Sequence, residues 1–358
     1  MPHRRDFLKA LGAGAAGACV TGRGRSDAFP SVQAGRPRRQ VMIAGRAVRV
    51  IDVHAHGVIP VEHTLAGTSL AGRGGGSGTS ILGAPRLQVM DEQGVDVQIL
   101  TINGYWWYAA DRDLARRIVV AQNEGLAAWV ASHPERFVAL ASVALQHPDL
   151  AAAQLEDGVT RLGLRGASIG GHVNGEDLSL AKYDPFWAKA AALGVPVFMH
   201  PGGAENLIRE GALRGRGDLG NVIGNPLETT YFLSRLIFDG VLDRFPGLRV
   251  CAAHAGGYLP SYLGRTEAAC VVRRDADCAN KKTPSEYLKS QIHIDTMVFS
   301  NEGLRHLVAE VGVGQIAYGT DVPFNWPVTV DLIVDAPFLS SADKEAILGG
   351  NASRLFRL

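Results

Sequence analysis

The chain has 358 residues, of which 46% are hydrophobic and 20% are charged. At roughly 150 residues per domain, this length allows two domains or one large barrel with an added segment, and it excludes a small disulfide scaffold or a simple binding module. The 36 lysine and arginine residues nearly balance the 35 aspartate and glutamate residues, which leaves a net charge of +1. A balanced chain has no overall field to attract nucleic acid or an anionic membrane. We therefore expect no nucleic-acid partner.

The N-terminus resembles a twin-arginine export signal. Arg4 and Arg5 precede a weakly apolar run at 10–20, which is too short for a transmembrane helix of about 20 apolar residues. We expect residues 1–38 to be a signal or disordered segment that directs export to the periplasm or the medium, without a stable membrane span. The alternatives are a disordered basic tail and a lipid anchor at Cys19, which follows a weak lipoprotein-like sequence.

The remaining residues, 39–358, alternate between short apolar runs and segments with helical spacing. A hairpin is predicted first, with strands at 40–43 and 48–53 around Ala44–Arg46. Eight strands are then expected at 49–53, 97–102, 137–143, 164–169, 195–200, 248–253, 292–295 and 316–318. Helical spacing marks 113–132, 150–161, 185–193, 226–243 and 301–311. Eight such repeats favour an α/β fold of the (β/α)8 TIM barrel type over an open doubly wound sheet. In addition, no phosphate-binding glycine motif follows the first strand, as a nucleotide-binding doubly wound sheet would require.

Two other segments stand out. The long, glycine-rich loop at 57–85, after the first strand, has the length of a functional lid. The basic stretch at 271–284 is expected to be a solvated loop or an oligomer-facing insertion. Without Cys19, the chain keeps an odd number of cysteines with no Cys-x-x-Cys pair, so we expect neither a disulfide framework nor a cysteine zinc site among Cys251, Cys270 and Cys278.

Polar side chains gather at the ends of the predicted strands. His54 and His56 alternate along the first strand, so both project to the same side, where two imidazoles can hold one divalent cation. His200 and His254 end later strands, and Asp321 follows the last one. In a parallel barrel all strand ends open on the face where active sites are built. These residues are therefore expected to converge.

Seven ordered motifs carry a resemblance to a known family: Asp52–His56, Met90–Asp96, His200–Pro201, Gly224–Thr229, His254–Gly257, Gly319–Phe324 and Gly350–Ala352. With them the sequence resembles the amidohydrolase superfamily, and within it the aminocarboxymuconate-semialdehyde decarboxylase-like branch. The resemblance runs from about residue 51 to the C-terminus. It implies a distorted (β/α)8 barrel and a homodimer.

The resemblance also implies one divalent metal ion and no organic cofactor. The ion is commonly zinc, with manganese or iron as alternatives, and its implied ligands are His54, His56, His200 and Asp321. His254 is implied to be the general acid/base and not a metal ligand, and Asp321 is implied to take part in proton transfer as well. Three imidazoles and a carboxylate suit zinc with a position left open.

Four further residues are candidates for binding a small carboxylate substrate. Arg73 in the long loop and Arg265 are cations able to orient a carboxylate, and Arg265 resembles a family arginine that reaches the neighbouring subunit's site. Trp106 belongs to an aromatic cluster that could wall a planar substrate or simply fill the core. Glu228 falls in the first turn of a helix, where a structural and a catalytic role remain open. Asp52 is expected to support the metal site without binding the ion, although the resemblance leaves open a ligand role, since related decarboxylases place an acidic metal ligand there.

The function that follows is a metal-dependent, non-oxidative decarboxylase of an unsaturated or aromatic carboxylic acid. The alternative is a hydrolase of a lactone, ester or amide that uses a metal-activated hydroxide. A non-enzymatic metal-binding barrel is a third hypothesis, because shared ligands serve several functions.

Overall fold

The structure is a computed structural model that describes residues 38–73, 82–324 and 326–358. The described chain begins with a hairpin of β1 (Met42–Ile43) and β2 (Arg46–Ala47). Its two turn residues, Ala44 and Gly45, have φ angles of 48° and 79°, which is the left-handed conformation of tight hairpin turns. A hairpin is thus present as predicted, but its second strand is Arg46–Ala47 and not 48–53, because a two-residue turn already brings Arg46 opposite Ile43.

Parallel strands follow at each of the eight predicted positions. They are β3 (Ile51–His56), β4 (Val97–Thr101), β5 (Phe137–Ala139) with β6 (Ala141–Ser142), β7 (Ala167–Ile169), β10 (Pro196–Met199), β11 (Arg249–Ala252), β12 (Ile292–Asp295) and β13 (Ile316–Ala317). A small antiparallel hairpin, β8 (His172–Val173) and β9 (Glu176–Asp177), lies between β7 and the next helix.

Hydrogen bonds close these strands into a barrel. β3, β4 and β5 form one sheet, and the other strands form a second sheet in the order β13-β12-β11-β10-β7-β6. Between β5 and β6, the Leu140 N–H donates to Leu100 O at 3.0 Å, so β5 and β6 are one interrupted strand that joins both sheets. At the other edge, the Val53 N–H donates to Tyr318 O at 2.9 Å and brings the first and last strands together. The predicted distorted (β/α)8 barrel is confirmed.

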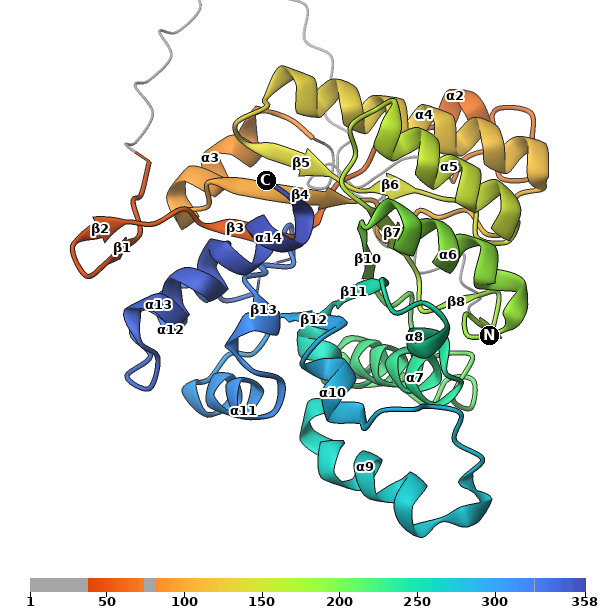
Figure 1. The fold of residues 1–358 in the computed structure, drawn as a ribbon. Helices are drawn as coiled ribbons and strands as arrows, with labels where there is room; N and C mark the ends of the chain where they lie inside the picture. Colours follow the sequence, from red (N-terminus) through yellow and green to blue (C-terminus); the bar gives the residue numbers. More distant parts are fainter. Residues whose placement is uncertain (1–37, 74–81, 325) are drawn as a thin grey trace, which may run out of the picture. The chain divides into compact units, whose positions relative to one another are not determined.

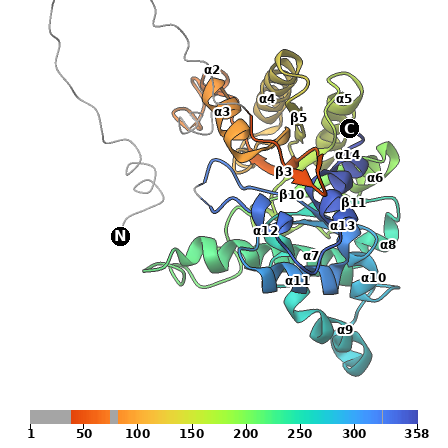
Figure 2. The ribbon, with the colours of Figure 1, turned by 90° about the vertical axis from the view of Figure 1, so that its left-hand side faces the viewer.

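Helices surround the strands in both views (Figures 1 and 2). Side-chain caps begin three of the described helices, with Asp111 accepting from the Leu114 N–H, Ser300 from the Gly303 N–H and Ser340 from the Asp343 N–H. The helices are α2 (Glu62–Leu65), α3 (Ala84–Gln93), α4 (Arg112–Ser132), α5 (Pro148–Thr160), α6 (Asp184–Leu193), α7 (Asn225–Phe238), α8 (Val241–Arg244), α9 (Leu263–Val272), α10 (Pro284–Leu288), α11 (Asn301–Val311), α12 (Val330–Val334), α13 (Ser341–Glu345) and α14 (Asn351–Phe356). Within the described ranges, none of them is both long and apolar enough to cross a membrane.

Strand side chains fill the inside of the barrel. A compact apolar cluster takes one residue or more from nearly every strand and is sealed by Ala352 and Phe356 of α14. A larger cluster packs the helices against the outside of the strands. The barrel is therefore a packed core, and the clustered histidines lie where the strands end.

Two further expectations were wrong. The helix predicted at 226–243 is two helices, because α7 ends at Phe238 and Gly240 adopts a left-handed φ of 68° before α8. Cys270 and Cys278 form a disulfide although no disulfide was expected, because the turn after α9 brings their Cα atoms to 6.0 Å. The third cysteine, Cys251, is buried and free in β11.

The long segment after β3 contains α2 and a series of turns before α3. Residues 74–81 of this predicted lid lie outside the described residues, as do Cys19 and the predicted signal up to residue 37.

Candidate metal and catalytic centre

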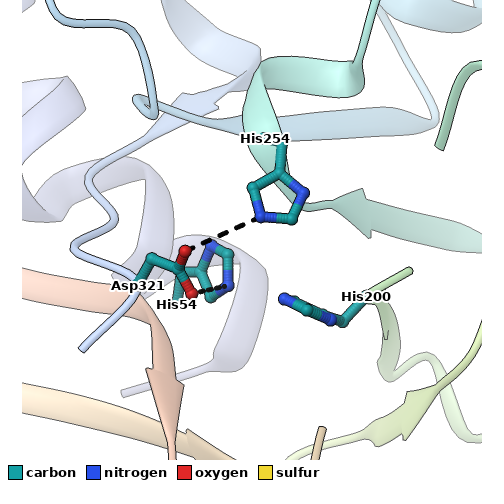
Figure 3. Close-up of side chains that lie close together, drawn as sticks. All are labelled: His54, His200, His254 and Asp321. Atoms are coloured by element: carbon teal, nitrogen blue, oxygen red, sulfur yellow. Dashed lines mark ion pairs between the residues drawn. The ribbon is translucent and has the colours of Figure 1, made fainter. Parts of the chain in front are cut away.

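Strand ends from across the barrel bring one cluster of ligand atoms together. His54 lies on β3, His200 directly follows β10, His254 comes two residues after β11, and Asp321 follows β13. One ligand atom from each of these four residues lies within 4.8 Å of the others. Figure 3 shows the three imidazoles around the carboxylate. The predicted convergence on one face of the barrel is thus observed.

Asp321 is the centre of this cluster. Its Oδ1 lies 3.0 Å from Nε2 of His54 and 2.8 Å from Nε2 of His56, and its Oδ2 lies 3.7 Å from Nε2 of His254. Burial alone would raise the pKa of Asp321, but the charge on His54 and hydrogen bonds from the histidines outweigh it and hold this pKa well below its ordinary value. The carboxylate is therefore ionised and available to a cation.

His54 is held from both sides. Its Nδ1 lies 2.7 Å from Oδ2 of Asp295, the last residue of β12. Burial opposes a charge on the ring, but the carboxylates of Asp321 and Asp295 outweigh it and raise the pKa of His54 to about 10. Asp295 was not singled out from the sequence. The available signal was its position, because it ends a strand as an acidic residue on the same face as Asp321.

His200 has the orientation of a ligand. Its Nδ1–H donates to Pro201 O at 2.8 Å, which leaves the Nε2 lone pair free to face the cluster. Burial first, and then the neighbouring His56, hold the pKa of His200 well below its ordinary value. The ring is therefore neutral, as metal binding requires.

His56 and His254 differ from their expected placement. The four-residue cluster contains His254, whereas His56 joins it only through its 2.8 Å contact with Asp321. The His254 side chain is 12% exposed, while that of His54 is fully buried. A ligand role for His56 and a free acid/base role for His254 stay predictions.

Asp52 supports the site without touching an imidazole in the described contacts. Its carboxylate accepts hydrogen bonds from the backbone N–H of His54 at 3.0 Å and from the backbone N–H and hydroxyl of Thr320 at 3.0 and 2.6 Å. Gln98 donates to the same carboxylate at 3.1 Å. Burial raises the pKa of Asp52 to about 6. Asp52 thereby fixes the residue that precedes Asp321.

Glu228 holds loops in place. Its buried carboxylate accepts hydrogen bonds from the backbone N–H groups of Gly171, Gly202 and Gly203 at distances of 2.7–3.2 Å. Trp106 is also buried, and its indole N–H donates to Ser168 O at 3.0 Å. Glu228 therefore braces the loops that follow β7 and β10, and Trp106 is anchored to β7 itself. Their predicted roles in substrate binding are not tested by these contacts.

The two candidate arginines are not drawn into the cluster. Arg73 is exposed beside the undescribed part of the long loop, and Arg265 is exposed on α9. Neither side chain makes a hydrogen bond or an ion pair with another described residue. Their roles toward a substrate carboxylate stay predictions.

The donor set fits a divalent metal ion. Three imidazoles and one carboxylate suit zinc or manganese, and donors bound to one ion at about 2 Å lie within about 4 Å of each other. The Nε2 atom of His54 is buried and, within the described part of the chain, has no well-aligned hydrogen-bond partner. A bound cation would accept this otherwise unused lone pair.

Comparison with known proteins identifies the family. Residues 51–358 match the amidohydrolase family. The chain is a member of that family. Residues 1–21 of this amidohydrolase match the twin-arginine translocation signal sequences, so it carries an export signal.

The amidohydrolase has decarboxylases among its relatives. It is 34% identical over 276 residues to 2-amino-3-carboxymuconate-6-semialdehyde decarboxylase of Dictyostelium discoideum, covering 75% of this chain and 74% of that protein. It is 31% identical over 288 residues to gamma-resorcylate decarboxylase of Rhodococcus jostii, covering 76% and 87%. A dihydroxybenzoic acid decarboxylase from a Polaromonas species, solved with bound manganese and the inhibitor 2-nitroresorcinol, superposes with a TM-score of 0.71 at 27% identity, covering 87% of this chain and 97% of that one.

Proposed function

We propose that this protein is a metal-dependent, non-oxidative decarboxylase of an unsaturated or aromatic carboxylic acid. The observation that carries the proposal is the placement of His254 beside Asp321, at a buried cluster that fits a divalent ion, in a family whose nearby relatives are decarboxylases. The enzyme is a carbon–carbon lyase that needs no organic cofactor, because the conjugated substrate accepts the electron pair itself.

The clustered residues have separate roles in metal binding and in proton transfer. His54, His56, His200 and Asp321 hold the ion, which when bound polarises the substrate and orients its oxygen atoms. The carbon that bears the carboxylate gains a proton, with His254 or Asp321 taking part in the transfer. The bond between that carbon and the carboxylate then breaks, CO2 leaves, and the electron pair of the bond restores the aromatic or conjugated system. Of the four clustered side chains, that of His254 is the most exposed to an incoming substrate.

The substrate carboxylate pairs with Arg73 or with Arg265, and Trp106 and Glu228 shape the pocket by fixing the loops around it. Zinc is the proposed resident ion, and the manganese in the Polaromonas relative makes manganese the first alternative to test. Arg265 acts in this scheme across a homodimer. The exposure of large apolar side chains near it, 81% for Val271, 70% for Val272 and 63% for Tyr262, supports an interface there.

The proposed location is the periplasm or the medium, reached through the signal within residues 1–38, and the catalytic barrel comprises residues 39–358. Because the exported enzyme meets its substrate outside the cytoplasm, we favour a chemically stable aromatic acid as that substrate.

The test is CO2 release by purified protein loaded with zinc or manganese, over a panel of hydroxybenzoates and unsaturated dicarboxylates, beside a chelator-treated sample. We expect CO2 from at least one acid, abolished by chelation and restored by metal. Metal-loaded protein that releases no CO2 from any acid but hydrolyses a lactone or ester would replace the decarboxylase by the hydrolase.

A further inference from the structure

Asp295 touches two functional elements at once. It is fully buried at the end of β12, and its two oxygens accept four hydrogen bonds. Oδ2 accepts from Nδ1–H of His54 at 2.7 Å and from the backbone N–H of His254 at 3.0 Å. Oδ1 accepts from the backbone N–H groups of Ala255 at 2.7 Å and Met297 at 3.1 Å. A single carboxylate oxygen thus contacts both a proposed metal ligand and the proposed acid/base.

The backbone that Asp295 holds on one side is strained. His254 and Ala255 both have left-handed backbone conformations, with φ angles of 55° and 56°, which are unfavourable for residues that carry a Cβ atom. Both of their N–H groups donate to Asp295. This turn directs the imidazole of His254 toward Asp321 (Figure 3). The carboxylate therefore stabilises the conformation that brings the acid/base to the site.

On its other side Asp295 selects the tautomer of His54. By accepting from Nδ1–H it leaves Nε2 without a proton when the ring is neutral, and Nε2 faces Asp321 at 3.0 Å. The pair has little room to shift. A Cβ atom added at Gly319 would lie 2.9 Å from Cβ of Asp295 and 3.0 Å from Cβ of His54.

We propose that Asp295 is a positioning residue that couples the metal-binding geometry of His54 to the orientation of His254. The proposal rests on the proposed function for the role of His254, whereas the part that concerns His54 is independent of it. Because both contacts share Oδ2, a displacement of the carboxylate disturbs the ligand and the acid/base together.

The principal test is Asp295→Asn, which keeps the size of the side chain but replaces one accepting oxygen by a donor. We expect the metal dissociation constant, measured by competition with a chromophoric chelator, to rise about 10- to 100-fold. At saturating metal, kcat should fall about 10- to 100-fold while KM stays within about threefold, because the acid/base is misplaced and not removed. The 1H shift of the Nδ1–H proton of His54 should move upfield in the metal-loaded variant, because this proton loses its charged acceptor.

The matched control is Asp243→Asn. Like Asp295, Asp243 accepts hydrogen bonds from a side chain and from a backbone N–H, here the hydroxyl of Tyr287 and the N–H of Lys281. Asp243 lies on α8, outside the ligand cluster. We expect this variant to lose stability while metal affinity and kcat remain those of the wild type. If Asp295→Asn does not fold, Asp295→Glu, which keeps the carboxylate but displaces its oxygens, should reproduce the paired losses.

Wild-type metal affinity in Asp295→Asn would overturn the proposal, and so would weakened affinity with full kcat at saturating metal. Should the wild type release no CO2 from any acid, the proposed function fails, yet the metal affinity and the shift of the Nδ1–H proton of His54 still decide whether Asp295 positions the ligand.

Discussion

Nε2 of His254 lies 3.7 Å from Oδ2 of Asp321, on the opposite oxygen from the 2.8 Å contact of His56. Either His56 or His254 could therefore be the metal ligand that joins His54, His200 and Asp321. We expect His254→Ala to keep its metal and lose about 100- to 10,000-fold in kcat, as for removal of a general acid. His56→Ala should lose metal and activity together. Metal content by atomic emission, beside CO2 release, checks both. An empty site in His254→Ala with a full one in His56→Ala would exchange the two roles.

Metal binding should depend on pH through His54. Its pKa of about 10 in the metal-free protein means that the ring is protonated at neutral pH, and a metal must displace that proton. Affinity therefore rises with pH, by about tenfold per unit from about pH 7 to about pH 9. Calorimetric titration in buffers of different ionisation enthalpy should count about one released proton. Affinity that does not change over this range would contradict a charged His54.

The same proton affects the stability of the metal-free protein. The folded pKa of His54 lies above its ordinary value of 6.5. Its stabilising contribution is thus complete below about pH 6.5 and is lost as the pH rises through about 10. Added metal should remove this dependence, because the ring is then neutral at every pH where the ion is bound.

Glu228 gives a prediction of the same sign in a more acidic pH range. Burial raises its pKa to about 7 from 4.5, so the folded protein binds this proton more tightly than the unfolded chain does. Its contribution to the free energy of unfolding therefore decreases as the pH rises from about 4.5 to about 7. Glu228→Gln should abolish that slope in thermal denaturation. It should also cost about 1–3 kcal/mol, because the amide nitrogen cannot accept from the backbone N–H groups of the loops. An unchanged slope would show that another group titrates.

The disulfide should contribute stability without affecting chemistry. Cys270 and Cys278 are separated by eight residues, and closing so short a loop in the unfolded chain is worth about 2–3 kcal/mol. We expect the double variant Cys270→Ser, Cys278→Ser to lose about that much in urea denaturation and to keep wild-type metal affinity. A reducing agent should destabilise the wild type and leave the double variant unchanged. Loss of metal affinity in the double variant would contradict a purely local role.

The sequence could predict what depends on local pattern. Apolar runs located all eight strands, and polar residues at their ends located His54, His200, His254 and Asp321, because parallel strands end on one face. Contacts between distant elements had no such signal. The hydrogen bonds of Asp295 to β3 and to the turn after β11 depend on how β12 lies beside β11 and, across β13, near β3. Likewise, the disulfide depends on a turn after α9, and the break between α7 and α8 depends on the conformation of one glycine.

The Cys270–Cys278 bond also bears on the order of events during export. A twin-arginine signal belongs to a route that moves proteins across the membrane already folded. In the reducing cytoplasm both thiols would remain reduced. The barrel could nevertheless fold and acquire its ion there. Cys270 lies near the end of α9 and Cys278 follows in the turn after it, and α9 extends away from the strands (Figures 1 and 2). The crosslink can therefore close after translocation, when an extracytoplasmic thiol oxidant accepts the two electrons, with no rearrangement of the barrel. Cys251 is buried, so it is not available to form a wrong disulfide with Cys270 or Cys278.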